Sequence, residues 1–264
     1  MASGAALYGG GGAGTSSTNG SNVGGSGAVR IIWAGPVGRP DRTFPSTRVI
    51  AQGYSVLFNG TNQYLSVPNN TALNPASSTI TVECWVNISS FSKFNHIYNK
   101  GGGSASGFYF GVNTSGVLFA EFRNTSNVAT TITGTTPLTL NTWTHIAFTR
   151  GASSVCNFWK DGIKDGSDTT ISTTVSPTAE LRIALGAGAS TDYYSGYISN
   201  LRFVKGAALY TANFTPPTST LGISATGATG LLTCKNTTII DEGDNAYVIT
   251  AYNTPTVSTS NGWF

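Results

Sequence analysis

The chain has 264 residues, which is room for one large β domain or two small ones. Only 9% of its residues are charged, against about 25% in a typical soluble domain, and this argues against an ordinary cytosolic α/β enzyme. With 39% hydrophobic and 11% aromatic residues, the chain is too apolar to be intrinsically disordered. Ser, Thr, Asn and Gly take the place of the missing charges and favour strands and turns, so we predict an all-β fold.

The first 53 residues differ in composition from the rest. Residues 1–28 hold ten of the 33 glycines and no charged residue, which marks a low-complexity arm. Up to residue 53 there are four arginines against one acid, and this difference equals the whole formal net charge of +3. We expect residues 1–53 to anchor the protein in an assembly, although a Gly-rich arm can also be a flexible linker. The predicted anchoring residues are Arg30, Trp33, Arg39, Arg42 and Arg48.

Several partners and cofactors are not expected. Four scattered arginines are a weak electrostatic footprint, so we predict no nucleic-acid partner. The sequence shows no apolar run of about 18 residues and no signal peptide, so we predict neither a membrane span nor secretion through a signal. Cys84, Cys156 and Cys234 are odd in number and far apart, which favours buried free thiols over disulfides or a zinc site.

From Tyr54 onward, short runs of alternating apolar and polar residues are separated by turn signals, as in a β-sandwich. The clearest run is 79–88, where every second residue from Ile80 to Ile88 is apolar and predicted to face the core. Asp161-Gly162 predicts a hairpin turn, since a type I′ turn needs positive φ at both central residues. The other predicted strands are 55–58, 63–67, 96–98, 108–112, 117–122, 143–150, 155–160, 181–185 and 197–204.

Four short sequence motifs in this region are informative through their order and spacing. They are residues 56–65 (VLFNGTNQYL), 81–86 (TVECWV), 143–150 (WTHIAFTR) and 158–162 (FWKDG). Together they resemble the laminin-G-like branch of the concanavalin A-like lectin/glucanase superfamily. The resemblance covers about residues 54–264 and implies a jelly-roll sandwich.

A further run, Gly196 to Gly206 with its continuation to Pro217, resembles the variant of this module found in structural proteins of marine tailed bacteriophages. A surface of Ser, Thr and Asn suits work outside cells, whereas unpaired cysteines suit synthesis in a reducing cytosol. A virion component made in the host cytoplasm and released by lysis has both properties. We therefore expect a surface-exposed virion protein.

No catalytic signature is visible. Retaining glycosidases need two carboxyls about 5 to 5.5 Å apart, whereas Glu83 and Glu121 each stand alone in a predicted strand. His96 and His145 lie beside no Cys, Ser or acid in a catalytic arrangement, so a packed or surface imidazole is predicted for both. We predict a protein that is not an enzyme, with a glycan-cleaving member of the superfamily as one alternative.

No cofactor or metal is predicted, although calcium stays open. Many laminin-G modules hold calcium at one rim, and the resemblance makes Asp192 the one acid that we nominate for it. Where related modules often have an acidic pair after Gly-x-Ile, this chain has Ser199-Asn200, which weakens the calcium prediction.

Two loops combine aromatic rings with polar side chains, as sugar-binding sites do. An alternative is that these rings cap the core or pack on a neighbouring protomer. The predicted glycan-binding residues are Asp192, Tyr193, Tyr194, Phe94 and Asn95.

These observations predict a non-enzymatic bacteriophage virion protein, as a capsid decoration or tail-fibre component. Its arm, 1–53, binds other virion proteins, and its sandwich, 54–264, reinforces the particle or adheres to host-surface polysaccharide. A homo-oligomer is expected, because interface cores are depleted of charge. A free-standing lectin is the other alternative.

Overall fold

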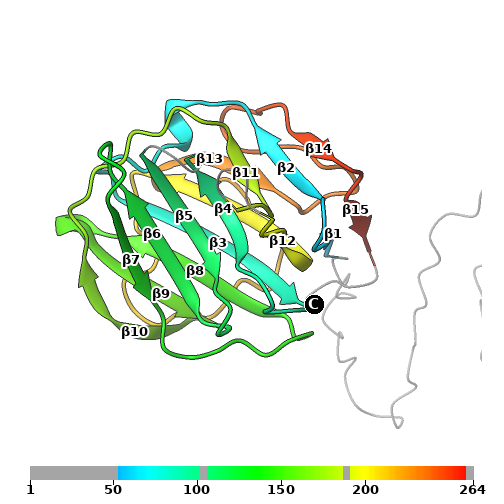
Figure 1. Ribbon diagram of the computed structural model, residues 1–264, viewed down its shortest axis with the longest axis horizontal. Helices are drawn as coiled ribbons and strands as arrows, with labels where there is room; N and C mark the ends of the chain where they lie inside the picture. The colour runs from blue at the N-terminus through cyan, green and yellow to red at the C-terminus, as the bar shows by residue number, and fades with distance from the viewer. Residues whose placement is uncertain (1–52, 102–105, 187–190, 260–264) are drawn as a thin grey trace, which may run out of the picture. The chain divides into compact units, whose positions relative to one another are not determined.

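The computed structural model describes residues 53–101, 106–186 and 191–259, which form two antiparallel sheets facing each other (Figure 1). The front sheet, nearer the viewer in Figure 1, has the order β14(Thr250–Tyr252), β2(Tyr64–Val67), β11(Leu181–Ile183), β4(Asn95–Lys100), β5(Gly107–Val112), β6(Leu118–Arg123), β7(Ala129–Thr133). The back sheet has the order β10(Ile163–Thr170), β9(Val155–Lys160), β8(Thr144–Arg150), β3(Ile80–Ile88), β12(Ser195–Lys205), β1(Ser55–Asn59), β15(Thr256–Ser258), and β13(Ala228–Thr233) also pairs with β12.

The all-β prediction is confirmed. The described residues contain only two helical elements, the short 3₁₀ turns Thr71–Leu73 and Ala152–Ser154. Neither of them is long or apolar enough to cross a membrane. All ten predicted strands are present, with ends displaced by two residues or fewer.

Five strands escaped prediction: β7, β10, β13, β14 and β15. Strand β7 is almost wholly exposed and Thr-rich, so it carries no apolar alternation. Strand β10 contains Asp165-Gly166 and a shift of register, and β14 and β15 have three residues each. Pairing with a neighbour, rather than a pattern of their own, makes these segments strands.

The core lies between the two sheets and follows the predicted alternation. Ile80, Val82, Cys84, Val86 and Ile88 are all buried in one hydrophobic cluster, as predicted for this strand. Rings from both sheets meet there, including Phe110 of the front sheet and Phe148 of the back sheet at 6.0 Å between centroids. Layers about 10 Å apart pack in this way in β-sandwiches.

The predicted hairpin turn is confirmed. Asp161 and Gly162 have φ of 49° and 77°, and Ile163 pairs with Lys160 directly after the turn. Cys84, Cys156 and Cys234 are free and buried, as predicted. Burial raises the pKa of the Cys156 thiol to about 11 and that of Cys234 to about 12, so both stay protonated near neutral pH.

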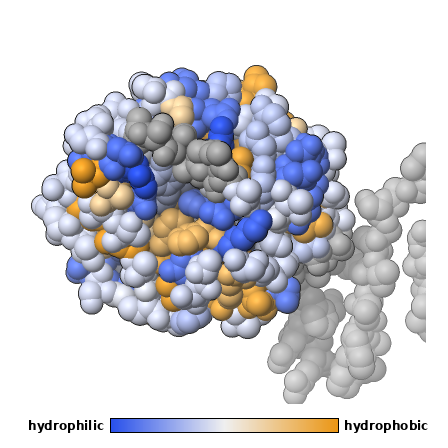
Figure 2. Space-filling model, in the orientation of Figure 1, coloured by the Kyte–Doolittle hydropathy of each residue, from blue (hydrophilic) through white to orange (hydrophobic). Residues whose placement is uncertain are grey.

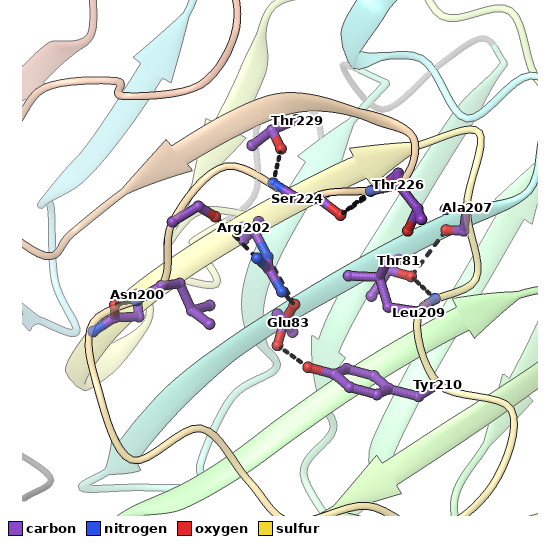
Figure 3. Close-up of polar contacts among 12 residues, drawn as sticks. Thr81, Glu83, Asn200, Arg202, Ala207, Leu209, Tyr210, Ser224, Thr226 and Thr229 are labelled. Atoms are coloured by element: carbon purple, nitrogen blue, oxygen red, sulfur yellow. Dashed lines mark hydrogen bonds and ion pairs between the residues drawn. The ribbon is translucent and has the colours of Figure 1, made fainter.

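Part of the outer face of the back sheet is covered by residues 206–227, which connect β12 to β13 and which we call the covering segment (Figure 3). Thr81 of β3 donates through Oγ1 to the Ala207 carbonyl at 3.0 Å and accepts from the Leu209 amide at 2.9 Å. Farther along, the Phe214 amide donates to the Gly162 carbonyl at 2.9 Å. Strand β3 is therefore buried on both faces over much of its length.

Residues 1–52 of the predicted arm lie outside the described residues, and so do its anchoring residues Arg30, Trp33, Arg39, Arg42 and Arg48. The arm, its boundary at residue 53 and its role in anchoring stay predictions.

Candidate functional site

The outer face of the front sheet is hollowed over strands β4 to β7. The hollow has a volume of about 370 Å³. Figure 2 looks onto this sheet and shows hydrophobic atoms gathered near the middle of the face, beside strongly hydrophilic ones. The lining residues are Phe94, His96, Tyr109, Phe119, Glu121, Arg123, Thr131 and Asp192.

Strand alternation explains why these side chains point outward. In β6, Leu118, Ala120 and Phe122 belong to the core cluster, so Phe119, Glu121 and Arg123 face the other way. In β5, Phe108 and Phe110 face inward in the same way and Tyr109 faces outward. The register places Tyr109 beside Glu121, and Glu121 beside Thr131, on one line across the sheet.

Aromatic rings form the floor of the hollow. The Phe119 ring lies edge-to-face against Phe94 at 5.2 Å and against His96 at 5.3 Å between centroids. The His96 and Phe94 rings lie 6.1 Å apart between centroids, with their planes inclined by 30°. Phe119 is only 3% exposed, whereas Phe94 is 39% exposed and offers the open ring surface of the group.

One wall of the hollow is a connected polar chain. The guanidinium of Arg123 donates to Glu121 Oε1 through Nε at 3.2 Å and Nη2 at 2.6 Å. Thr131 Oγ1 donates to Glu121 Oε2 at 3.1 Å, and Arg123 Nη1 donates to Asn127 Oδ1 at 3.0 Å. These bonds hold the side chains of the wall in place. The remaining carboxylate lone pairs and guanidinium N–H groups can bind a ligand.

The two loops predicted from sequence meet at the rim. Lys93 Nζ donates to the Thr191 carbonyl at 2.9 Å, which ties the loop before β4 to the loop before β12. Phe94 from the first loop and Asp192 from the second both line the hollow. Two of the five predicted glycan-binding residues are therefore brought together.

The other three predicted residues do not line the hollow. Asn95 is 2% exposed, and its amide bonds hold the chain in place, since Nδ2 donates to the Ser90 carbonyl and Oδ1 accepts from the Ser195 amide. Tyr194 is fully buried in the core, edge-to-face against Phe58. Tyr193 lies beside Tyr64 of β2. Asn95 and Tyr194 present no surface to a sugar, and we leave both out of the site.

Sequence reasoning did not assign six lining residues to a sugar site, all of them on or beside strands: His96, Tyr109, Phe119, Glu121, Arg123 and Thr131. The alternation of inward and outward positions along β5 and β6 could have pointed to them. Large aromatic and charged side chains at the outward positions of β5 and β6 are unusual in a chain with so little charge. Their meeting depends on strand pairing, which the sequence does not state.

His96 is an uncharged member of the floor. Burial lowers its pKa from 6.5 to about 4, although the charges of Asp192 and Glu121 act in the opposite direction. The imidazole is therefore neutral at physiological pH and can offer both a hydrogen-bond donor and an acceptor.

The back sheet holds a second cluster of polar and aromatic groups, centred on Glu83 and closed over by the covering segment (Figure 3). Arg202 donates to Glu83 Oε1 through Nε at 2.9 Å and Nη2 at 2.6 Å, and the Tyr210 hydroxyl donates to Oε2 at 2.6 Å. His145 Nε2 lies 3.3 Å from the same Oε2, and Phe214 packs edge-to-face on its ring.

This cluster is closed to a ligand. Glu83 and His145 are both fully buried, so of the two environments predicted for His145, packed or on the surface, the structure shows the packed one. Burial alone would raise the pKa of Glu83, but the hydrogen bond with His145 and the charge of Arg202 outweigh it and lower the pKa. The cluster holds an ionised carboxylate inside the fold.

Among the described residues, no group of three or more His, Cys, Asp and Glu side chains is arranged to hold a metal ion. Asp192 lies on the rim of the hollow, and its nomination for calcium stays a prediction.

The comparisons with known proteins agree with this architecture. The family model of the concanavalin A-like lectin/glucanases superfamily matches residues 59–209. No curated protein matches the chain.

Among solved structures, a protein from Bacteroides ovatus ATCC 8483 to which carbohydrate binding is ascribed matches at a TM-score of 0.59 and 18% identity. The match covers 80% of this chain and 61% of that protein, so this chain spans less than two thirds of its relative. A heptameric SAP-like pentraxin from Limulus polyphemus matches at a TM-score of 0.51 and 15% identity, over 75% of this chain and 94% of the pentraxin. These likenesses show a shared fold, and with the family model they establish that the chain belongs to the concanavalin A-like lectin/glucanase superfamily.

Proposed function

We propose that the protein binds carbohydrate in the hollow of the front sheet and does not cleave it. The observation that carries the proposal is the pairing of an open ring, Phe94, with a fixed polar wall, Glu121 and Arg123, in one hollow. The C–H faces of a sugar ring pack on aromatic surfaces, and its hydroxyls need polar groups held in place. Carbohydrate binding ascribed to a structural neighbour supports the same proposal.

Binding without cleavage is supported by the bonds of the acid in the hollow. Both oxygens of Glu121 are engaged, one by Arg123 and the other by Thr131. A carboxyl group fixed in this way is held by the wall of the hollow and keeps lone pairs that can accept hydrogen bonds from sugar hydroxyls. A glycan-cleaving enzyme, the alternative, would release reducing ends from the bound polymer, and Glu121→Gln would abolish that release.

We further propose that the module is displayed on a bacteriophage particle and held there by residues 1–53. The support is the resemblance of Gly196 to Pro217 to phage structural proteins, together with the charge-poor composition and the three free thiols. In this role, the arm binds other virion proteins and the hollow adheres to host-surface polysaccharide. Mass spectrometry of purified particles tests the location: the full chain should be a stoichiometric component, and a variant lacking residues 1–50 should be lost from the particle.

The binding proposal is tested by a glycan array with the full chain, followed by calorimetry on the best ligand. Phe94→Ala and Glu121→Gln should each weaken binding about tenfold or more, which corresponds to about 1.4 kcal/mol. Tyr197→Ala, on the outer face of the back sheet, is the matched control and should bind as the wild type does. Binding that survives both substitutions in the hollow would refute the proposal.

A further inference from the structure

The outer face of the front sheet carries a second group of aromatic residues away from the hollow. Tyr64 of β2 and Tyr252 of β14 stand directly opposite each other, and their rings are stacked at 4.3 Å between centroids with planes 3° apart. Tyr193 lies beside Tyr64 at 6.4 Å. Tyr252 is 38% exposed, and every residue of β14 is exposed. We call Tyr64, Tyr193 and Tyr252 the tyrosine patch.

Strand register shows that the patch and the hollow share one face. Each residue of one line across the sheet pairs with the next, and the order is Thr250, Ser66, Arg182, Asn99, Tyr109, Glu121, Thr131. Tyr109, Glu121 and Thr131 at one end of the line belong to the hollow. Tyr64 and Tyr252 are two residues from Ser66 and Thr250 at the other end, so they point to the same side.

The two groups lie within reach of one extended molecule. Three strand spacings of about 4.8 Å separate β2 from β5 and four separate β14 from β5. Measured across the sheet, Tyr64 therefore lies about 14 Å and Tyr252 about 19 Å from Tyr109. The same loop contributes to both, because Asp192 lines the hollow and the next residue, Tyr193, packs beside Tyr64. Arg182, in the line between them, forms an ion pair with Glu180 at 2.8 Å and adds polar groups.

We propose that the tyrosine patch is a second sugar-binding subsite, which holds a more distant part of the same polysaccharide chain that occupies the hollow. The inference rests on the proposed function and adds the class of ligand, a polymer rather than a single terminal sugar. The exposed ring of Tyr252 supplies the stacking surface, and the Glu180–Arg182 pair supplies partners for hydroxyls. A cross-strand aromatic pair also stabilises β14, so the test must separate binding from stability.

The test measures affinity against ligand length with the full chain. The ligands are laminari-oligosaccharides, or the same series of whichever polysaccharide binds most tightly on the array, from disaccharide to hexasaccharide. Wild-type affinity should rise with length. Tyr252→Ala should remove most of that rise, about tenfold at the longest ligand, and leave the disaccharide affinity unchanged. Tyr252→Phe keeps the ring, so its affinity should still rise with ligand length. Tyr252→Leu keeps an apolar contact for β14 but has no ring, so its affinity should no longer rise with length.

Two results would overturn the inference while leaving the hollow as a binding site. One is wild-type affinity that does not change with length, and the other is a Tyr252→Ala loss that is equal for short and long ligands. Thermal unfolding of each variant shows whether a loss of affinity comes from unfolding. The subsite would also be refuted if Tyr252→Leu unfolds as the wild type does and its affinity still rises with ligand length. Failure of every ligand to bind refutes the proposed function, and the second subsite with it.

Discussion

The two sheets carry similar side chains on their outer faces but use them differently. The front sheet has Glu121 with Arg123, and the back sheet has Glu83 with Arg202. Each pair stands near a histidine and aromatic rings, His96 with Phe119 in front and His145 with Phe214 behind. The difference is the covering segment, residues 206–227, which closes over the back cluster. Among the described residues, no equivalent segment lies over the hollow.

This difference shows that residue type alone does not identify a site. A glutamate–arginine pair that is open to solvent costs little to keep and can exchange hydrogen bonds with a ligand. The same pair under a covering segment has lost its hydration, and the fold must compensate both charges. The front cluster therefore suits recognition, and the back cluster holds the covering segment in place.

The largest effect is expected from removing the cation of the back cluster. Arg202→Met leaves the buried Glu83 carboxylate without its charged partner and should lower the free energy of unfolding by about 3 to 5 kcal/mol, measured by urea denaturation. Arg182→Met removes the partly exposed partner of Glu180 and should cost at most about 1 kcal/mol. If the two variants lose the same free energy of unfolding, the buried Glu83 does not depend on Arg202 more than an exposed acid depends on its partner.

The contact between the covering segment and the hairpin turn is tested by a glycine. Gly162 has φ of +77°, and a Cβ atom there would lie 1.9 Å from the Phe214 carbonyl oxygen. Gly162→Ala should therefore lower the unfolding free energy by about 1 to 3 kcal/mol. Gly166→Ala is the matched control, because Gly166 also has a positive φ, +91°, but a Cβ there meets only ordinary contacts at 3.6 Å or more, and it should cost less, about 1 kcal/mol. Equal costs for Gly162→Ala and Gly166→Ala would mean that the covering segment does not press on the turn.

An effect that depends on pH is expected from His96 in the front cluster. The pKa of His96 is about 4 in the folded chain and 6.5 in the absence of burial, so between these values the unfolded chain binds more protons. The contribution of His96 to stability is complete above about pH 6.5 and is lost as the pH falls toward about 4. Urea denaturation should show a shallower decline over this window for His96→Phe than for the wild type. Identical slopes would mean that His96 is not held neutral.

The sequence predicted the fold well because alternation is a local property. Every second residue from Ile80 to Ile88 faces the core as predicted, and the Asp161-Gly162 turn has the expected backbone. The five missed strands lack such a local pattern and depend on their neighbours.

The site was predicted only in part, for the same reason. Phe94 and Asp192 were found because loops that combine rings and polar groups are visible in sequence. Tyr194 has the same composition around it, yet its ring enters the core, and its hydroxyl donates to the Tyr197 carbonyl at 3.0 Å. Glu121 and Arg123 gain their meaning from β5 and β7 beside them, which only strand pairing reveals.

The most direct test of the account is a titration of the full, isotopically labelled chain with its best oligosaccharide, followed through backbone amide chemical shifts. We expect the largest shifts on Phe94 and His96, on β5 and β6, and on Asp192, while the shifts of Glu83, His145 and the covering segment stay unchanged. Shifts centred on the covering segment and β3, with the front sheet silent, would contradict it.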